Sequence, residues 1–552
     1  MPSADHGHAI ASPGVGDNVI DERNLEAGST SIGIKVDFLE WSGIDHDDAK
    51  RRYDLEARDN HVSLPDSSAS SVLGTRKNVI HWEEDDPENP YNWSSGWKCY
   101  IVLVGMLVVI NSTMGSSLPS NAIPFIAPDF HITSESAEIL PMSMYLLGYV
   151  LGPLVFCPLS EQFGRRTIML ATFFCYTAFT LGCALTPTWG GLLAFRILAG
   201  VNASSPISVS GGIYADIYKD PVTRGRAMAV FTAGTCVGPL VAPIISGFIS
   251  PVLGWRWTFW IGLIFAGASW VPLVFLPETY GPVLLLKRAK QLRKETGDSE
   301  IIAPIELEKQ DLKQMVTVTL TRPIRMLFFE LIVLAACTYL ALAYGIFYMY
   351  FEAYPIIFEG IYGQSSGVSG LMFLPIGGAS KKAWAQKEES RRLPLAILGG
   401  PLYVISLFWL GWTSRASIPF YVPMLAGIPF GMGFILIFIA LLNYLTDAYE
   451  VFAASAMAAS SCCRSLAGAV LPFAAKPMYT KLGVPWASSL LAFLSLLMCG
   501  IPVLFTWKGD RIREGSVFCQ ELKERKMKEL ENLQRDRLVK EHRQNAEVTE
   551  KL

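Results

Sequence analysis

The sequence is poor in charge. Only 17% of its 552 residues are Asp, Glu, Lys or Arg, whereas a soluble protein usually carries about 25%. The deficit is uneven, because the charges crowd into residues 1–97, 281–325, 381–392 and the tail after 507. Long apolar runs lie between them, and an apolar run of about 20 residues matches the hydrocarbon core of a bilayer. The composition excludes an ordinary soluble domain and indicates a membrane protein.

Paired cysteine motifs and a cleavable signal are also missing. The ten cysteines lie almost entirely within apolar runs, and none forms a CxxC or CxxxxC spacing. We therefore expect small buried thiols, no disulfide and no metal site. The N-terminal stretch is polar, and the first apolar run begins near Lys98. That run is too long for a signal-peptide core and is expected to be an uncleaved signal-anchor.

Twelve apolar runs are candidate membrane spans, and eleven of them have a convincing length. Each should be helical, because the bilayer core offers the backbone no water as a hydrogen-bond partner. The runs are 99–118, 139–159, 168–186, 190–213, 228–250, 258–277, 327–350, 366–380, 394–413, 419–442, 452–475 and 484–506.

Lysine and arginine near the ends of the spans predict the orientation. With a cytoplasmic N-terminus, the inner loops hold far more basic residues than the outer loops, so both termini are expected inside. The inner set is Arg165, Arg166, Lys219, Arg224, Arg226, Lys287, Arg288, Lys290, Arg322, Arg325, Lys381, Lys382, Arg391 and Arg392, and the outer set is Arg256, Arg415, Lys476 and Lys481.

The expected fold class is an all-α membrane protein made of two six-helix bundles. Residues 1–97 are predicted to be a disordered cytoplasmic tail, and 98–280 the first bundle. Residues 281–325 form a cytoplasmic linker that is too polar for the membrane, 326–507 the second bundle, and 508–552 a charged cytoplasmic tail. Two such halves favour a carrier with a central site at their interface.

The first motif, CPLSEQFGRR, lies between spans two and three. Gly164 permits a tight turn, Arg165 and Arg166 lie at the membrane surface, and Glu161 ends the preceding span. An acid and a base at a helix junction can form a latch that holds one conformation. Simple positive-inside anchoring explains the same residues equally well.

Two further motifs lie inside spans. Arg196 is a lone arginine two turns into span four, where it should face the bundle interior or a wet cavity. The run GTCVGPLVAPIISG in span five combines small residues, which allow close helix packing, with prolines that bend a helix. Its members are Gly234, Gly238, Pro239, Pro243 and Gly247.

Together these motifs resemble the major facilitator superfamily, in particular its twelve-span drug:proton antiporter branch in fungi. The loop motif matches at Leu159, Gly164, Arg165 and Arg166, although Cys157 stands where the family has glycine. Further landmarks are Arg196 with Gly200, Gly238 with Pro239, DPENPYNW at 86–93, WRWTFW at 255–260, PETY at 277–280 and TRPIRML at 321–327.

The resemblance implies roles for particular residues. Glu161, Gly164, Arg165 and Arg166 would act as a conformational latch with Asp216, the acid at the end of span four. Arg196 would take part in proton coupling, and the Gly–Pro motif of span five would indicate antiport. By the intramembrane argument applied to Arg196, Arg464 in span eleven would also lie on the transport path.

Span eight departs from the family. Its apolar part, Val368 to Ala379, is 12 residues, about 18 Å of helix against a hydrocarbon core of about 30 Å. Three interpretations remain open: a deletion or mis-spliced gene, a short span completed by Ser365 and its neighbours, and a re-entrant segment.

The sequence thus predicts a secondary transporter that exports small amphipathic organic molecules, such as drugs or fungal secondary metabolites, driven by a proton gradient and without a cofactor. Asn121, Tyr344, Glu352 and Asn443 are weaker candidates for the substrate cavity. The expected partners are the substrate, protons and lipid, with no nucleic acid, for a monomer in the cell membrane or a vacuolar or vesicular membrane. Transport of a polar metabolite such as a polyamine, and a non-transporting sensor, are the alternatives.

Overall fold

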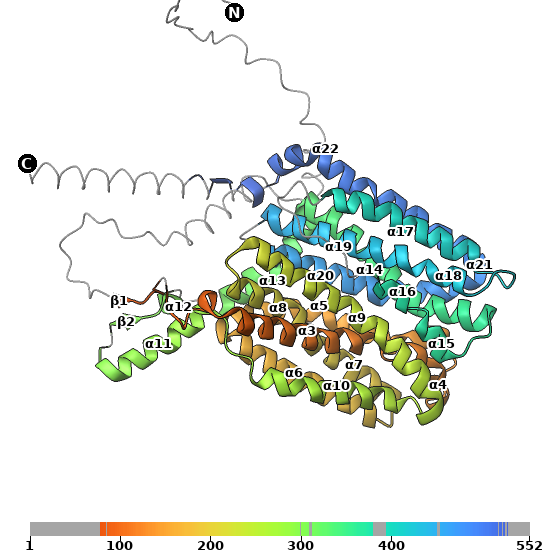
Figure 1. Ribbon diagram of the computed structural model, residues 1–552, viewed down its shortest axis with the longest axis horizontal. Helices are drawn as coiled ribbons and strands as arrows, with labels where there is room; N and C mark the ends of the chain where they lie inside the picture. Colours follow the sequence, from red (N-terminus) through yellow and green to blue (C-terminus); the bar gives the residue numbers. More distant parts are fainter. Residues whose placement is uncertain are drawn as a thin grey trace, which may run out of the picture. The chain divides into compact units, whose positions relative to one another are not determined.

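A computed structural model describes most of the chain beyond residue 77 (Figure 1). The described residues are 78–83, 85–298, 300–307, 312–378, 393–449, 453–516, 518–520, 523–524 and 527. The predicted tail before residue 78, the basic run at 381–392 and the predicted tail helix beyond 527 lie outside these ranges.

The first half of the membrane region is built from antiparallel helices joined by short turns. Its elements are α3 (Ser95–Ser117), η2 (Ser120–Ala122), α4 (Ile123–Asp129), α5 (Glu135–Phe163), α6 (Arg165–Leu185), α7 (Trp189–Ala203), α8 (Ser205–Ile217), α9 (Pro221–Leu253) and α10 (Arg256–Val274). Pro119 and Pro206 fall where α3 passes into η2 and where α8 begins, as expected for a residue that lacks a backbone N–H.

The second half repeats this plan less regularly. Its elements are α14 (Leu331–Tyr354), η3 (Pro355–Ile361), α15 (Ser366–Leu371), α16 (Leu374–Gly378), α17 (Leu393–Thr413), α18 (Tyr421–Leu425), α19 (Gly427–Tyr449), α20 (Ala453–Val470), α21 (Pro472–Met498) and α22 (Gly500–Glu514). Gly483, with φ of +74°, divides α21 into two arms. The first arm continues α20, and the second continues into α22.

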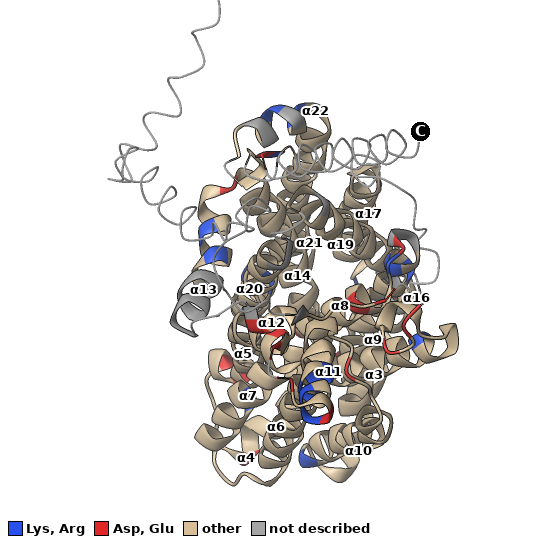
Figure 2. Ribbon diagram, turned by 90° about the vertical axis from the view of Figure 1, so that its left-hand side faces the viewer, with Lys and Arg blue, Asp and Glu red and all other residues tan. Residues whose placement is uncertain are grey.

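The two ends of the bundle are defined by contacts between helix termini. At one end, Arg165 at the start of α6 contacts Asp216 at the end of α8 and Glu278 after α10. At the other, Asp129 at the end of α4 pairs with Arg256 at the start of α10. We call these the linker end and the far end. Figure 2, turned to face the left-hand side of Figure 1, shows basic residues on α11 (Gly281–Thr296) and α13 (Leu312–Phe329), while the spanning helices are almost wholly uncharged.

Ten helices among the described residues are long and apolar enough to cross a membrane. The all-α expectation is confirmed, since the only sheet in the described residues is a pair of two-residue strands. The two remaining expected spans differ from the rest. Span eleven is α20, a helix of 18 residues rich in alanine and serine. Among the described residues, span eight consists of the pair α15 and α16.

The described part of span eight, α15 and α16, lies near the far end of the bundle. Helix α15 packs on α9, where a Cβ added to Gly247 would lie 2.3 Å from the carbonyl oxygen of Ser366. Helix α16 packs on α19, and a Cβ on Gly431 would lie 2.1 Å from the Ile376 carbonyl oxygen. Helix α15 is therefore in close backbone contact with α9, and α16 with α19. The segment starts with Ser365 at its N-cap position, but the residues after 378 that would continue it are not among those described.

A small folded unit lies outside the membrane helices at the linker end. Strand β1 (Asn78–Val79) pairs in parallel with β2 (Ile301–Ile302), and apolar side chains beneath them pack on α11. Asp86 forms an ion pair with Arg288 of α11. The prediction of a disordered tail up to residue 97 is therefore wrong for the last 20 residues. Periodicity gave no sign of this, because a two-residue strand is too short to leave a pattern.

The ion pair between Asp86 and Arg288 holds the segment before α3 against α11 at neutral pH. The hydrogen bond from the Arg288 guanidinium holds the pKa of the Asp86 carboxyl below its usual range. A lowered folded-state pKa contributes stability that is fully present above the ordinary carboxyl pKa and is lost as the pH falls through the folded-state value. The contact between the lead-in segment and the linker therefore persists at physiological pH.

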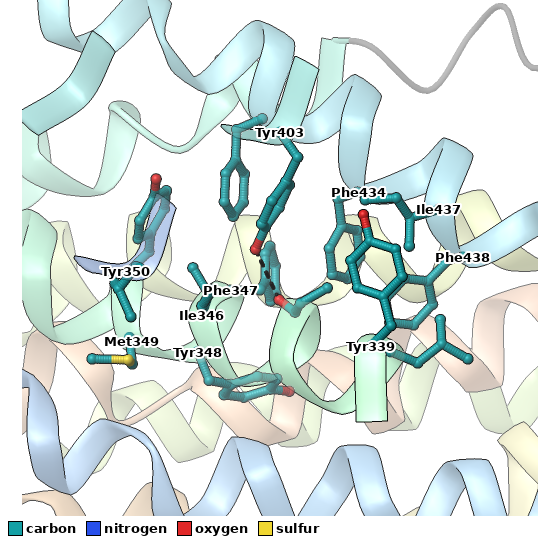
Figure 3. Close-up of a cluster of buried hydrophobic side chains, with 14 of the residues drawn as sticks. Tyr339, Ile346, Phe347, Tyr348, Met349, Tyr350, Tyr403, Phe434, Ile437 and Phe438 are labelled. Carbon is teal, nitrogen blue, oxygen red and sulfur yellow. Dashed lines mark hydrogen bonds between the residues drawn. The ribbon is translucent and has the colours of Figure 1, made fainter. Parts of the chain in front are cut away.

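The apolar core of the second half is rich in aromatic side chains. Phe347 stacks with Phe434, and Tyr350 stacks with Phe430, with ring centroids 5.1 and 4.3 Å apart. Figure 3 shows the α14 side chains facing those of α19 and α17, and the Tyr403 hydroxyl donating to the Ala343 carbonyl oxygen 3.0 Å away. Such a bond compensates for the burial of the tyrosine hydroxyl. The core continues into the first half through Leu146 and Leu240.

The glycines of α9 set its distance from α3. A Cβ on Gly238 would lie 2.1 Å from the Thr113 hydroxyl and 2.7 Å from the Ile110 carbonyl oxygen, whereas one on Gly267 of α10 would meet nothing within 4 Å. The backbone of α3 cannot yield as a flexible side chain can. Small residues at such contacts allow the backbones of membrane helices to approach closely.

Gly238→Ala should therefore force α9 away from α3 and destabilise the protein by about 1–3 kcal/mol. Gly267→Ala, in an equally apolar helix, serves as the matched control and should leave the melting temperature unchanged. Thermal unfolding of the purified full chain in detergent measures both. Equal melting temperatures for the two variants would contradict the packing described here.

Candidate functional site: an arginine cluster at the linker end and two arginines within the bundle

The turn between α5 and α6 depends on one glycine. Gly164 has φ of +92°, a conformation that only glycine adopts without strain, and it reverses the chain between Phe163 and Arg165. Helix α6 therefore begins abruptly, with its first backbone N–H groups lacking partners within the helix.

The carboxylate of Glu278 accepts these N–H groups. Its Oε1 lies 2.9 Å from the backbone N of Arg165, and its Oε2 lies 3.2 Å from that of Arg166. The same carboxylate accepts from the backbone N–H groups of Thr279 and Tyr280, each at 3.0 Å. An anion is stabilised at a helix N-terminus by the helix dipole and the free donors. Glu278 thus ties the end of α10 to the start of α6.

The side chain of Arg165 points into the bundle and gathers the remaining groups. Its Nε donates to Asp216 at 3.1 Å and its Nη1 donates to the Ser160 hydroxyl at 2.6 Å. Glu161 is more distant, at 3.8 Å, and the guanidinium lies 4.8 Å from the centre of the Tyr280 ring. We call Glu161, Arg165, Asp216 and Glu278 the Arg165 cluster.

The predicted latch residues are thus mostly brought together. Glu161, Gly164, Arg165 and Asp216 meet within the cluster, but Arg166 turns outward and donates to the Val274 carbonyl oxygen at 3.0 Å. Glu278 was missed as a member of the site, although PETY was noted as a landmark. An acid directly after a span and near the start of another helix was the available signal.

Arg196 is fully buried and makes three hydrogen bonds. Its guanidinium donates to the carbonyl oxygens of Gly115 at 2.7 Å and Ser116 at 3.1 Å, at the end of α3, and to that of Pro141 in α5 at 2.7 Å. The Gly115 carbonyl has no helical partner because Pro119, four residues on, lacks an N–H. The cation also faces the ring of Tyr145, 4.3 Å away. Arg196 therefore caps the carboxyl end of α3 and joins three helices.

Arg464 lies in a different environment. It is half-buried in the middle of α20, and its Nε donates to the Ser460 carbonyl oxygen of its own helix at 3.3 Å. The guanidinium lies 5.3 Å from the ring of Phe438 and 5.9 Å from that of Tyr344. The structure thus distinguishes two arginines that the sequence placed in one class.

Helix α9 carries the Gly–Pro motif between the two halves. Gly234 and Gly238 face α3, while Gly247 faces α15. Pro243 cannot donate to the carbonyl of Pro239, and the hydroxyl of Ser117 donates to that oxygen instead, at 3.2 Å. This contact supplies in hydrocarbon the hydrogen bond that the proline removed.

Polar contacts join the halves from the middle of the bundle to the far end. The Asn121 amide donates to the carbonyl oxygens of Pro243 at 3.2 Å and Ser366 at 3.1 Å, which makes it a bridge between the halves. Tyr348 shares a hydrogen bond with Ser116 at 2.7 Å. Asn443, another predicted cavity residue, is half-buried on α19.

A group of charges lies between the halves near the far end. Lys476 of α21 pairs with Glu135 at 3.3 Å and Glu138 at 3.4 Å, both from α5. Glu352 of α14 interacts with Glu138 and Lys476, and its Oε1 is buried without a hydrogen-bond partner. The Lys476 ion pair was another contact that the sequence did not reveal, because its partners are more than 300 residues apart.

These features are those of a membrane carrier: two helical halves, charged groups at their interface, and close glycine-lined contacts between helices. The chain belongs to the Major Facilitator Superfamily, whose profile matches residues 105–472. The resemblance drawn from the motifs is thereby confirmed.

Several similar proteins of known name are fungal efflux pumps or transporters. The chain is 38% identical over 466 residues to the MFS-type efflux pump MFS2 of Trichophyton rubrum, covering 80% of this chain and 78% of that one. It is 39% identical to the efflux pump FUB11 of Gibberella moniliformis, covering 79% and 76%. It is 38% identical to the multidrug transporter mdrA of Aspergillus fumigatus, covering 79% and 75%.

Solved structures confirm the fold. The proton:xylose symporter XylE superposes with a TM-score of 0.56 and 18% sequence identity, covering 75% of this chain and 96% of that one. The human organic anion transporter MFSD10 superposes with a TM-score of 0.53 and 18% identity, covering 73% and 99%. These structures establish the fold, and membership of the family establishes a transport function in a membrane.

Glu278→Gln should loosen the linker end. The neutral amide is not attracted to the helix N-terminus as the carboxylate is, and it has one acceptor oxygen where the carboxylate uses two. We expect the free energy of unfolding to fall by about 1–3 kcal/mol. Glu161→Gln is the matched control, because Glu161 is half-exposed and 3.8 Å from its partner, and surface pairs contribute about 0–1 kcal/mol. Melting of the purified chain should fall clearly for the first variant only; an equal fall for both would argue against a special part for Glu278.

Proposed function

We propose that the chain exports small amphipathic organic molecules in exchange for protons, by alternating access between its two halves. The observation that carries this proposal is the packing of the α9 Gly–Pro face between α3 and the short α15, at the contact between the halves. The similarity to fungal proteins named as efflux pumps supports the direction of transport.

We also propose that the protein lies in the cell membrane with the linker end in the cytoplasm. The excess of basic residues at this end supports that orientation. The Arg165 cluster would then serve as the cytoplasmic latch, since every one of its charged groups comes from a helix end or a connection that must shift if the helices move.

Proton coupling needs a group that can release its proton, and arginine does not do so in proteins. Arg196 would therefore act by holding α3, α5 and α7 in place rather than as a proton carrier. Glu352 is the better candidate for the carrier, because one of its oxygens is buried without a partner and it interacts with the Lys476–Glu138 pair between the halves. Loss or gain of one proton there would change the balance of charge across the interface.

Expression in yeast that lacks its main exporters tests the function directly. Cells carrying the full chain should accumulate less of at least one dye in a panel of fluorescent amphipathic compounds, and a proton uncoupler should abolish the difference. Surface expression is checked by labelling. If the uncoupler changes the accumulation of none of the dyes in the panel, proton-driven export is contradicted.

Glu352→Gln tests the proton carrier. The amide cannot titrate, so export should fall to the level seen with the uncoupler while the folded protein persists. Glu135→Gln is the control, because Glu135 also pairs with Lys476 but is largely exposed, and its export should remain sensitive to the uncoupler. Full uncoupler-sensitive export by the Glu352 variant would remove this residue from the proton path.

A further inference from the structure

Arg464 is a cation with too few partners for its position. A guanidinium has five N–H donors, and Arg464 makes one hydrogen bond, a 3.3 Å contact to the Ser460 carbonyl oxygen one turn away. Arg196, which lies in the first half, donates to three carbonyl oxygens instead. Both arginines lie within spans, but Arg196 is fully buried whereas Arg464 is half-buried.

No carboxylate neutralises Arg464 within the part of the chain that the structure describes. The ion pairs found there involve Arg165, Arg256, Arg288, Arg293 and Lys476. The charged carboxylates between the halves already engage Lys476, near the far end of the bundle. An unpaired charge in a membrane span is costly, and such residues commonly face a substrate or ion pathway.

The walls around the guanidinium come from two other helices. Tyr344 of α14 and Phe438 of α19 present their rings to it, and the two rings lie 6.2 Å apart. Figure 3 shows Phe438 at the edge of the aromatic cluster of the second half, beside Phe434. Cation–π contacts of this kind partly compensate the charge, but they supply no acceptor to the guanidinium N–H groups other than the Nε–H that donates to Ser460.

The position also lies on the contact between the two halves. The neighbouring Cys462 contacts the Val150 carbonyl oxygen of α5 at 3.2 Å. A Cβ on Gly468, one turn further along α20, would meet both the Tyr344 ring and Leu146 of α5. The hydroxyl of Tyr344 is 3.4 Å from that of Tyr348, which bonds to Ser116 in the first half. A ligand on Arg464 would therefore be near groups from both halves.

We propose that Arg464 binds the carboxylate of an exported aromatic or amphipathic acid, whose apolar body lies against Tyr344 and Phe438. This inference rests on the proposed export function and assigns it a substrate class, organic anions. A guanidinium matches a carboxylate with two parallel hydrogen bonds. The carboxylate oxygens of the acid would accept hydrogen bonds from the guanidinium, and the rings of Tyr344 and Phe438 would contact its apolar body.

Ligand-dependent stabilisation of the purified full chain tests the proposal. Aromatic carboxylates are each compared with their primary amide, beginning with 2-naphthoate and 2-naphthamide. The pair differs in charge and hardly in size. Wild-type protein should be stabilised by carboxylates at concentrations at least about tenfold lower than by the amides, since hydrogen bonds to charged groups are the strong ones.

The variants locate the effect. Arg464→Gln should lose the preference for carboxylates, and Arg464→Lys should retain part of it because the charge remains. Arg415→Gln is the matched control: Arg415 also stacks on an aromatic ring, that of Trp412 at 5.6 Å, but lies exposed outside the spans. It should keep the full preference. The comparison of acid with amide on the wild-type protein needs no variant, so misfolding of one variant cannot hide the answer.

Three results would overturn the proposal. They are a wild-type protein without preference for any carboxylate over its amide, a preference that survives in Arg464→Gln, and stabilisation by chloride that equals that by the carboxylates, which would assign the site to an inorganic anion. Failure of the export function is recognised separately. Carboxylate-selective binding without uncoupler-sensitive export would reject export and leave the site, whereas export without carboxylate selectivity would reject the site alone.

Discussion

The absence of water in the hydrocarbon core is the constraint on which this structure depends. Each backbone N–H and C=O must find its hydrogen-bond partner inside the protein. The membrane region is therefore built almost entirely from helices, in which the backbone groups bond to one another. At two places where a proline removes a donor, another residue supplies one. The hydroxyl of Ser117 donates to the carbonyl released by Pro243, and Arg196 donates to the carbonyl released by Pro119. These repairs fix α9 and α7 against α3.

The same constraint separates the charged groups of the bundle into two kinds. Arg165 and Arg196 are surrounded by acceptors, so they hold helices in defined positions. Arg464 and Glu352 are not satisfied in this way: one guanidinium has a single weak bond, and one carboxylate oxygen has none. Groups of the first kind give a carrier its rigid parts. Of the second kind, Arg464 lies on α20 and Glu352 on α14, both next to the first half.

Close helix contact is the other requirement for two halves that move. Glycines on α9 bring its backbone against α3 on one side and against α15 on the other. At the linker end the connection is electrostatic, through Glu278 and the start of α6. The described part of span eight follows the same rule, since Gly247 of α9 meets α15 and Gly431 of α19 meets α16.

The sequence by itself determined the membrane location, the helical class, the two halves and the family, because these follow from apolar run length and from short motifs read in order. It also located Glu161, Gly164, Arg165 and Asp216, whose meeting place is a single helix junction. The sequence did not reveal the contacts of Glu278 and Lys476 or the ordered segment before Ser95. Their partners are distant in the chain, and such contacts leave no periodic signal. Only the tertiary structure decided which intramembrane arginine is bonded and which is not. Both look alike as single charges in apolar runs, and the difference lies in whether other helices bring carbonyl oxygens within reach.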